Sequence, residues 1–501
     1  MTATEQAIRK SPDLRFGNWI EQRSPGIGGL GLVATGVFFG GVVIALVALL
    51  FGGLLAAGIV LAVTAVVVTA TGTTLGRRAA RSTGYARQRN AGEHQWRSGV
   101  FSRNRNPAIR LPGMLGRTTI VEKADPFNQP FVVIKNPARG GYYTIVARCV
   151  ADGPWLQDAE RLNGWVGGYS RVLTALGQEP GLVCAKAISD TAPDPGNRLA
   201  SMVSALMPED GTVPDLALAT MNECVADYPT TSSENVTYVE LTFRGRALNR
   251  KGDEASILAE LSRKVPGLMG QMASAGWGAV SMVTAAELPA IVRVAYDPAS
   301  QPFLEQAALS QEDHHIDWTE AGPTAYQDFW DRLVHDSGVS VTWEMFEAPR
   351  AAITSLAAAG LLAPHSDFTR KRIALIYRPH SPEASVQVSE SDANSARMMA
   401  SQSKKRMTAM ASLRMDATDR SREEVASGAV MVRFSILLTA TVGAGGDLER
   451  AVATMESRAG TVPLRVRRCY GTQAAAFATT LPVGFVPWEH TVIPQSVREW
   501  M

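Results

Sequence analysis

A run of 53 residues without a charged side chain constrains this chain of 501 residues more than any other feature. The run covers residues 24–76, between Arg23 and Arg77, and consists mostly of Val, Leu, Ala, Ile, Phe and Gly. A membrane crossing takes roughly 20 apolar residues, because the hydrocarbon core is about 30 Å thick and an α-helix rises about 1.5 Å per residue. The run is therefore long enough for two crossings.

The adjacent glycines Gly52 and Gly53, near the centre of the run, predict a tight turn, since glycine adopts left-handed backbone conformations without steric cost. We expect one helix over residues 30–51 and a second over residues 54–74. A buried hairpin of a soluble core fits less well, because soluble helices keep a polar stripe and neither half has one. A cleaved signal peptide does not fit either, since the run is far longer than a signal core.

Basic residues flank the run on both sides, whereas the expected turn has none. They are Arg9, Lys10, Arg15 and Arg23 before the run, and Arg77, Arg78, Arg81, Arg87 and Arg89 after it. Positively charged flanks stay in the cytoplasm. We therefore expect a multi-pass protein of the cytoplasmic membrane with two helices and both termini in the cytoplasm. The G-x-x-x-G spacing of Gly36 and Gly40 lets helices approach closely in lipid, which predicts a helix contact within the hairpin or with a partner.

Charge is unevenly distributed along the chain. Residues 77–117 hold ten Arg and one acid, a net charge of +9, whereas residues 118–501 hold 35 bases and 43 acids, a net charge of −8. We expect the basic segment to contact anionic lipid through Arg77, Arg78, Arg81, Arg87 and Arg89. Nucleic acid is the alternative ligand for such a segment, but the acidic body would repel phosphate, so we do not expect direct binding.

Periodicity beyond the run predicts a mixed body of α+β and α/β character. Strands are expected over residues 117–123, 130–135, 142–150 and 181–188, and helices over 154–176 and 389–425. Two stretches, 235–283 and 430–468, share the order strand, helix (253–274 or 446–458), Ala-Gly, strand, which suggests two related α/β halves. The expected organisation is a cytoplasmic tail (1–25), a two-helix transmembrane hairpin (26–76), a basic juxtamembrane linker (77–116), a first α/β domain (117–308), a polar connector (309–323) and a second α/β domain (324–501).

Motifs that carry chemistry are not found in the sequence. A P-loop needs a Gly-Lys pair to hold phosphates, and this sequence has no such dipeptide. It also has no H-E-x-x-H, no G-x-S-x-G and no paired C-x-x-C. The acidic and histidine-rich residues 312–317 fit a solvated connector better than a metal site, because adjacent residues of an extended chain point to opposite faces. We expect no enzyme, no cofactor, no metal and no catalytic residue.

Four segments of the second half carry a resemblance. They are "WEMFEAPR" (343–350), "TRKRIALIYRPHSPEAS" (369–385), "REEVASGAVMVRFSILLTATV" (422–442) and "FATTLPVGFVP" (477–487). Their order resembles the amino-terminal, non-nucleotide-binding region of conjugation ATPases of type IV secretion systems, which ends in a Leu-Pro-x-Gly element. The tail and hairpin resemble the small inner-membrane subunit that is sometimes fused to that ATPase. The whole chain is similar to actinobacterial integral membrane proteins of conjugative elements.

The resemblance implies an integral inner-membrane structural component of a conjugation or type IV-like secretion apparatus. Its implied partners are a separate Walker-type ATPase, since the P-loop domain of the family is missing here, and other membrane subunits of the apparatus. The docking residues would be Leu481, Pro482, Gly484 and Trp488, because the motor domain of the family continues from there. Trp488 covering its own domain's core is the alternative interpretation. Other candidate functions are the two-helix membrane component of a type VII secretion system and a membrane-anchored enzyme with an unrecognised site.

Overall fold

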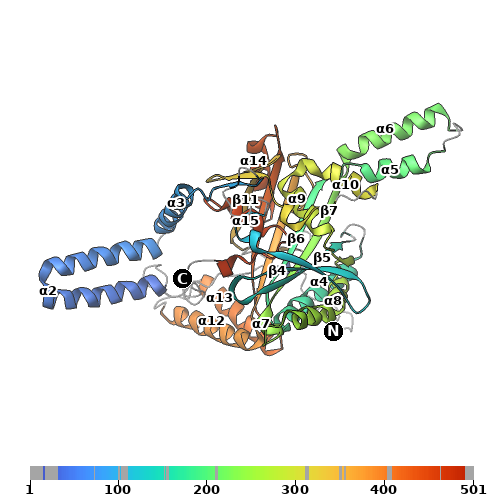
Figure 1. Ribbon diagram of the computed structural model, residues 1–501. Helices are drawn as coiled ribbons and strands as arrows, with labels where there is room; N and C mark the ends of the chain where they lie inside the picture. The colour runs from blue at the N-terminus through green and yellow to red at the C-terminus, as the bar shows by residue number, and fades with distance from the viewer. Residues whose placement is uncertain are drawn as a thin grey trace.

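The computed structural model describes residues 15–16, 32–72, 74–99, 102, 111–151, 153, 157–208, 213–310, 315–348, 353–354, 357–402, 409–462 and 464–490. Its first long element is the apolar α2 (Leu32–Gly72), which is helical except at Gly53, where φ is 74° and ψ is −175°. Figure 1 shows the α2 ribbon running out from the body and back beside itself. α3 (Thr74–Asn90) follows. The segment that we predicted as a linker thus contains most of a helix, together with β2 (Gln95–Arg97).

One large sheet forms the centre of the body, and all the strand pairings among the described residues are antiparallel. The strand order is β2, β9 (Ala325–Asp328), β10 (Leu333–His335), β11 (Gly338–Glu347), β14 (Val432–Gly443), β13 (Arg370–Pro379), β6 (Leu182–Pro193), β7 (Ser233–Arg244), β5 (Tyr142–Val150), β4 (Pro130–Asn136) and β3 (Thr119–Ala124). β8 (Ala279–Met282) pairs with β5, and β15 (Arg465–Arg468) pairs with β11. β1 (Arg15–Phe16) and β12 (Ile353–Thr354) pair separately.

Helices cover both faces of the sheet. The longer ones are α4 (Ala159–Gln178), α5 (Asn197–Leu206), α6 (Asp215–Thr231), α8 (Glu254–Ser274), α9 (Glu287–Tyr296), α12 (Pro382–Gln402), α13 (Ala409–Ala426) and α14 (Leu448–Thr461). The shorter ones are α7 (Gly245–Leu248), α10 (Gln301–Leu309), α11 (Ala359–Leu362), α15 (Gln473–Thr479), η3 (Gly113–Arg117), η4 (Ala138–Gly140), η5 (Pro298–Ser300), η6 (Trp318–Glu320) and η7 (Pro487–His490).

The strands divide their side chains between two cores, because successive residues of a strand point to opposite faces. In β7, Val239 and Leu241 pack with α4 and α8, whereas Tyr238 packs with α9 and α15 on the other face. The first face continues over the second half of the sheet as the core under α14 and α11. The second face holds Glu240 and many other buried polar side chains, among them His335 and Ser340.

The two predicted α/β halves are not separate units, because the pairing of β6 with β13 joins their strands into one sheet. The antiparallel pairing also differs from the parallel sheet that an α/β alternation usually indicates. The same succession nevertheless occurs twice: β5–β7–β6 in the first half corresponds to β11–β14–β13 in the second. Each half inserts a helix pair before its middle strand, α5–α6 or α12–α13.

Local signals explain the elements that were predicted correctly. The side chain of Asp253 accepts a hydrogen bond from the Ser256 amide (3.0 Å) and caps α8, and Asp447 caps α14 in the same way (3.0 Å to the Arg450 amide). Both helices therefore begin close to their predicted first residues, and the predicted strands correspond to β3, β4, β5 and β6. The single helix predicted over residues 389–425 is wrong, since α12 and α13 are two helices that pack against each other.

Candidate functional site

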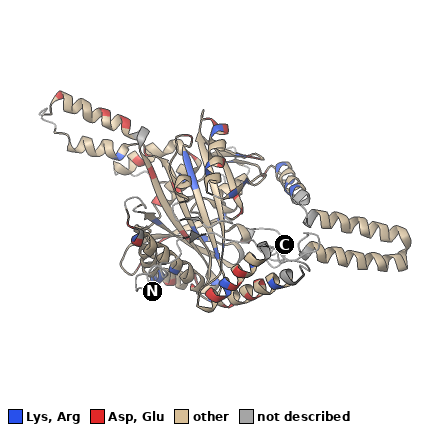
Figure 2. Ribbon diagram, turned by 180° about the vertical axis from the view of Figure 1, so that it is seen from behind, with Lys and Arg blue, Asp and Glu red and all other residues tan. Residues whose placement is uncertain are grey.

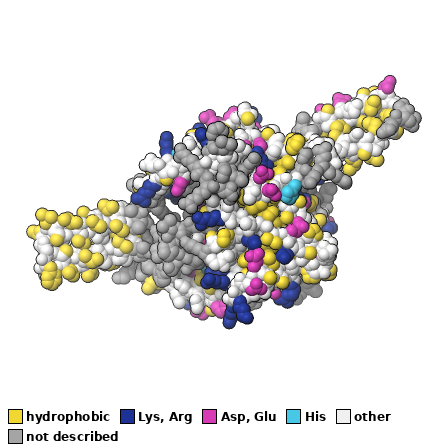
Figure 3. Space-filling view, viewed as in Figure 1, with side chains coloured by type: hydrophobic (Ala, Val, Ile, Leu, Met, Phe, Trp, Pro, Cys, Tyr) yellow, Lys and Arg dark blue, Asp and Glu magenta, His cyan; other side chains and the backbone are white. Residues whose placement is uncertain are grey.

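The surface of α2 is apolar almost everywhere. Within the described residues, the helical segment Ala34–Thr69 is long and apolar enough to cross a membrane, with a mean hydropathy of 2.7. The large side chains beside the break at Gly53 are among the most exposed of the chain, with Phe51 at 89% and Leu54 at 84%. Figure 3 shows hydrophobic side chains over the whole projecting segment. A surface of this kind is stable against lipid and unfavourable in water.

The close contact between the two segments of α2, before and after Gly53, lies at Gly41 and not at the predicted glycines. A Cβ atom added at Gly41 would overlap the side chain of Thr64. Among the described residues, none lies within 4 Å of such an added atom at Gly36 or Gly40. The prediction of a contact inside the hairpin at these two glycines is therefore wrong, because the helix turns them away from the other segment. Contact with a partner helix remains a prediction for Gly36 and Gly40.

The basic helix α3 is held against the body. Tyr85 donates a hydrogen bond from Oη to the carbonyl of Asp328 (3.2 Å), and Gln88 donates from Nε2 to the Asp328 carboxylate (3.3 Å). The ring of Tyr85 also meets Trp330 edge to face, with the centroids 5.3 Å apart. Burial raises the pKa of Asp328 to about 6. Sequence reasoning missed this attachment, since a single Tyr and Gln between arginines give no periodic signal.

The arginines of α3 form a basic surface next to the apolar α2, and α3 contains no acidic residue. Arg78, Arg87 and Arg89 are exposed and Arg81 is half-buried, while the side chain of Arg77 lies outside the described residues. Because α3 is fixed to the body, the basic surface also has a fixed position relative to the sheet. The predicted lipid contact thus concerns a structured helix and not a loose linker.

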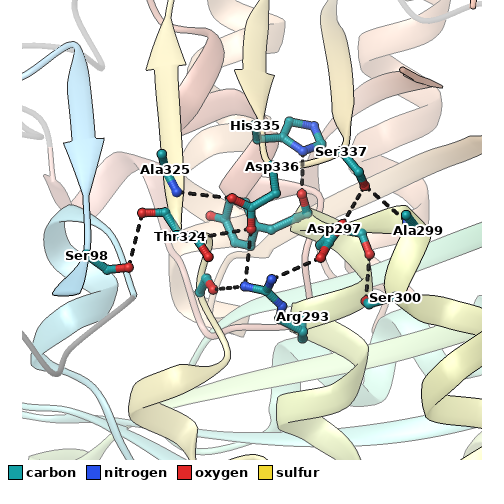
Figure 4. Close-up of polar contacts among 12 residues, drawn as sticks. Ser98, Arg293, Asp297, Ala299, Ser300, Thr324, Ala325, His335, Asp336 and Ser337 are labelled. Atoms are coloured by element: carbon teal, nitrogen blue, oxygen red, sulfur yellow. Dashed lines mark hydrogen bonds and ion pairs between the residues drawn. The ribbon is translucent and has the colours of Figure 1, made fainter. Parts of the chain in front are cut away.

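A second polar cluster ties α9 of the first half to the β10–β11 hairpin of the second (Figure 4). The guanidinium of Arg293 lies 3.2 Å from the Asp336 carboxylate and 2.9 Å from that of Asp297. Asp336 also accepts the backbone amides of Thr324 and Ala325, each at 3.0 Å. The ion pairs and hydrogen bonds of this cluster, which we call the clamp, link the two halves of the body.

His335, next to this clamp, forms a base–hydroxyl pair with Ser340. Its Nδ1–H donates to the carbonyl of Tyr296 (2.6 Å), and its Nε2 accepts from Ser340 Oγ (2.7 Å), which in turn lies 2.7 Å from Thr441 Oγ1. Such a pair can serve as base and nucleophile where a substrate reaches it. Here His335 is 1% exposed and Ser340 is 0% exposed, so the pair is part of the core. Burial lowers the pKa of His335 to about 4 and keeps the ring neutral.

The predicted docking residues near the end of the chain are mostly buried. Leu481 belongs to the core on the α9 face together with Val132 and Val146 of the first half. The Gly484 amide donates to the carboxylate of Glu240 (3.0 Å), which forms a buried ion pair with Lys186 (2.9 Å).

Gly484 has a φ of 70°, and a Cβ there would lie 2.7 Å from Thr144 Oγ1, so only glycine fits. Pro482 is buried as well, and Trp488 is half-buried with the guanidinium of Arg378 over its ring. Leu481, Pro482 and Gly484 cannot meet a partner in this conformation, because they already cover the core of the first half. The prediction that they dock an ATPase is therefore replaced by a packing role.

The comparisons with known proteins concern only the region around α2. A family model described as a domain of unknown function (DUF8461) matches residues 23–79, which span α2 and the start of α3. No curated protein matches the chain.

Proposed function

We propose that this chain is an integral inner-membrane scaffold, with two membrane crossings, that docks a separate cytosolic ATPase in a conjugation or type IV-like secretion apparatus. The observation that carries the proposal is the succession of an apolar α2, a basic α3 and a large sheet body in a fixed arrangement. The type of apparatus and the ATPase rest on the resemblance of residues 343–487 to the non-nucleotide-binding region of conjugation ATPases.

Two features support two crossings. α2 spans 41 residues, about twice the roughly 20 that one crossing needs. Gly53 breaks the helix near its middle, and Gly41 contacts Thr64 from the other segment. If both ends of α2 lie on the same side of the membrane, the exposed arginines of α3 support a cytoplasmic body, since basic flanks stay in the cytoplasm.

The attachment of α3 supports a scaffold role. Tyr85 and Gln88 connect α3 to Asp328 at the end of β9, so a displacement of the body would be transmitted to α2 through packed contacts. A flexible linker would not transmit it.

Cysteine labelling tests the topology in intact cells. A cysteine placed at Gly53 should react with a membrane-impermeant maleimide from outside, and a cysteine at Ser102 should react only after permeabilisation. A Cys224→Ser background removes the exposed native thiol. Labelling of position 102 in intact cells would contradict the proposed orientation.

Co-purification tests the partner. The full-length protein, extracted in mild detergent, should retain a Walker-type ATPase of the same apparatus, identified by mass spectrometry. A matched sample of a membrane protein with an unrelated body controls for carry-over. If no ATPase is retained under any mild condition, the docking function fails and the membrane topology is unaffected.

A further inference from the structure

The α5–α6 helix pair projects from the body at the end opposite α2, as Figures 1 and 2 show from both sides. We call it the arm. α5 has no buried residue, and every residue of α6 from Asp215 to Cys224 is exposed. Helices of this length are marginal in water without packing against another surface. The arm thus presents two helices that the body supports at their base.

Large apolar side chains line the arm. Met202 and Leu206 of α5 are 61% and 77% exposed, and Leu216 of α6 is 80% exposed. Leu218 and Met221 continue the series on α6 and are also exposed. Figure 3 shows hydrophobic side chains along the arm, interspersed with acidic ones. Exposed apolar patches with a polar rim mark surfaces that bind other proteins.

The rim of this apolar surface is acidic. α5, α6 and the adjoining α10 contain four carboxylates and one guanidinium, Arg198, a net charge of −3. The carboxylates are Asp215, Glu223, Asp227 and Glu305. At the base of the arm, the guanidinium of Arg198 forms ion pairs with Asp194 (3.8 Å) and Glu234 (3.7 Å). The arm and the helix beside its base are therefore apolar and negative.

We propose that the arm is the docking element for a soluble protein whose surface carries an apolar groove bordered by Lys and Arg. Helix-in-groove binding uses this combination of exposed apolar side chains and a charged rim. The membrane is not the occupant, because the arm lies at the far end of the body from α2. A second copy is disfavoured, since two acidic arms would repel each other. The partner's identity rests on the proposed function, which makes it the separate ATPase.

A photoreactive amino acid at Leu216 in the full-length chain, expressed in its native cells, tests the arm directly. Phe127, 72% exposed in the turn between β3 and β4, is the matched control site. We expect an adduct with a soluble protein at position 216 and none at position 127. Cys224 gives a second readout on the same helix, because it is exposed while the other three cysteines are buried.

Charge reversal tests the complementarity. Asp215→Lys with Glu223→Lys should reduce the adduct about tenfold, as removal of complementary charge slows encounter and weakens binding. Glu390→Lys with Asp416→Lys changes the charge equally on exposed positions of α12 and α13 and should leave the adduct unchanged. With the purified ATPase, maleimide labelling of Cys224 should slow in the parent chain and not in the arm variant.

The outcomes separate the two proposals. An adduct with the ATPase that depends on Asp215 and Glu223 supports both. A charge-dependent adduct with another soluble protein that has a basic-rimmed groove supports the arm and refutes the ATPase function. An ATPase that binds the full-length chain without touching the arm refutes the arm alone. An adduct with a second copy, an adduct with lipid, or no adduct at position 216 overturns the arm proposal.

Discussion

Single residues on the α9 face of the sheet join parts of the chain that lie far apart in sequence. Glu240 of β7 accepts the Gly484 amide and pairs with Lys186 of β6, and the side chains of both ionic partners are fully buried. Arg293 connects α9 to Asp336 in the turn after β10. Buried charges of this kind are expensive to leave unpaired, so they specify which segments meet.

The ion pair gives a prediction for stability. Lys186→Met should destabilise the fold by about 3–5 kcal/mol, because it leaves the Glu240 carboxylate buried without a counter-charge. The double variant Lys186→Met with Glu240→Gln should recover most of this loss, since the amide oxygen still accepts from Gly484. Thermal or urea unfolding of the detergent-solubilised chain measures both. If the double variant is as unstable as Lys186→Met alone, the unpaired Glu240 carboxylate is not the cause of the destabilisation.

His335 gives a prediction for pH dependence. Its pKa is lowered from 6.5 to about 4 by burial, so the unfolded chain binds a proton that the folded chain excludes. The stability from the neutral ring is present above pH 6.5 and falls by about 3 kcal/mol as the pH drops to 4. Asp328 has the opposite effect on stability. Its pKa is raised to about 6, so its protonation stabilises the folded chain as the pH drops.

The comparison with His335→Asn isolates the histidine from Asp328. Asn offers an amide donor for the Tyr296 carbonyl and does not titrate in this range, so the variant should lose less stability on acidification. Unfolding midpoints measured at pH 7 and pH 5 test this. Equal losses in the two proteins would mean that His335 is not the titrating group.

At the scale of the element, the repeated succession of strands and helices places two helix pairs in equivalent positions with different surroundings. α12 and α13 pack against each other, and Ser385, Ser389 and Ala393 of α12 are buried, whereas α5 has no buried residue. The same topological position therefore supports a packed pair in one half and a projecting pair in the other. This difference is the reason to assign an external contact to α5–α6.

The α2 segment gives a prediction about helix contact. Gly41→Leu should destabilise the contact between the two segments of α2 by about 1–3 kcal/mol, because its side chain would collide with Thr64 on the other side of the break. Gly36→Leu and Gly40→Leu are matched controls in open space and should leave the monomer stable. Thermal unfolding in detergent measures the three variants. If Gly40→Leu lowers the stability of the monomer as much as Gly41→Leu does, the two segments of α2 meet elsewhere. If Gly40→Leu disrupts only oligomers, Gly36 and Gly40 contact a partner helix.

At the scale of the whole molecule, charge and hydropathy follow one axis. The apolar α2 lies at one end, the basic α3 beside it, and the acidic arm at the opposite end (Figure 2). Such a distribution of charge favours an anionic surface at the α2 end and a basic partner at the far end. The net charge of +2 conceals this separation.

The basic end gives a prediction about lipid. Each arginine of α3 close to an anionic surface adds about 1 kcal/mol of attraction, which decays over a Debye length of about 10 Å at 0.1 M salt. In nanodiscs, trypsin should therefore cleave α3 more slowly with anionic than with zwitterionic lipid, and about 0.5 M salt should abolish the difference. Stronger protection by single-stranded DNA than by anionic lipid at equal salt would favour the nucleic-acid alternative.

The sequence by itself determined the features that depend on neighbouring residues. The uncharged run, the arginines after it, the capping Asp253 and Asp447, and the short apolar runs of β4 and β5 are local patterns, and their physical effect does not depend on the rest of the chain. Only the tertiary structure decided which strands pair and which surfaces stay exposed. Leu481 and Leu206 are equally apolar in the sequence, but the first half covers Leu481 and leaves Leu206 in solvent. Burial depends on the element that packs against a face, and here that element comes from more than 200 residues away, as the bond between Glu240 and Gly484 shows.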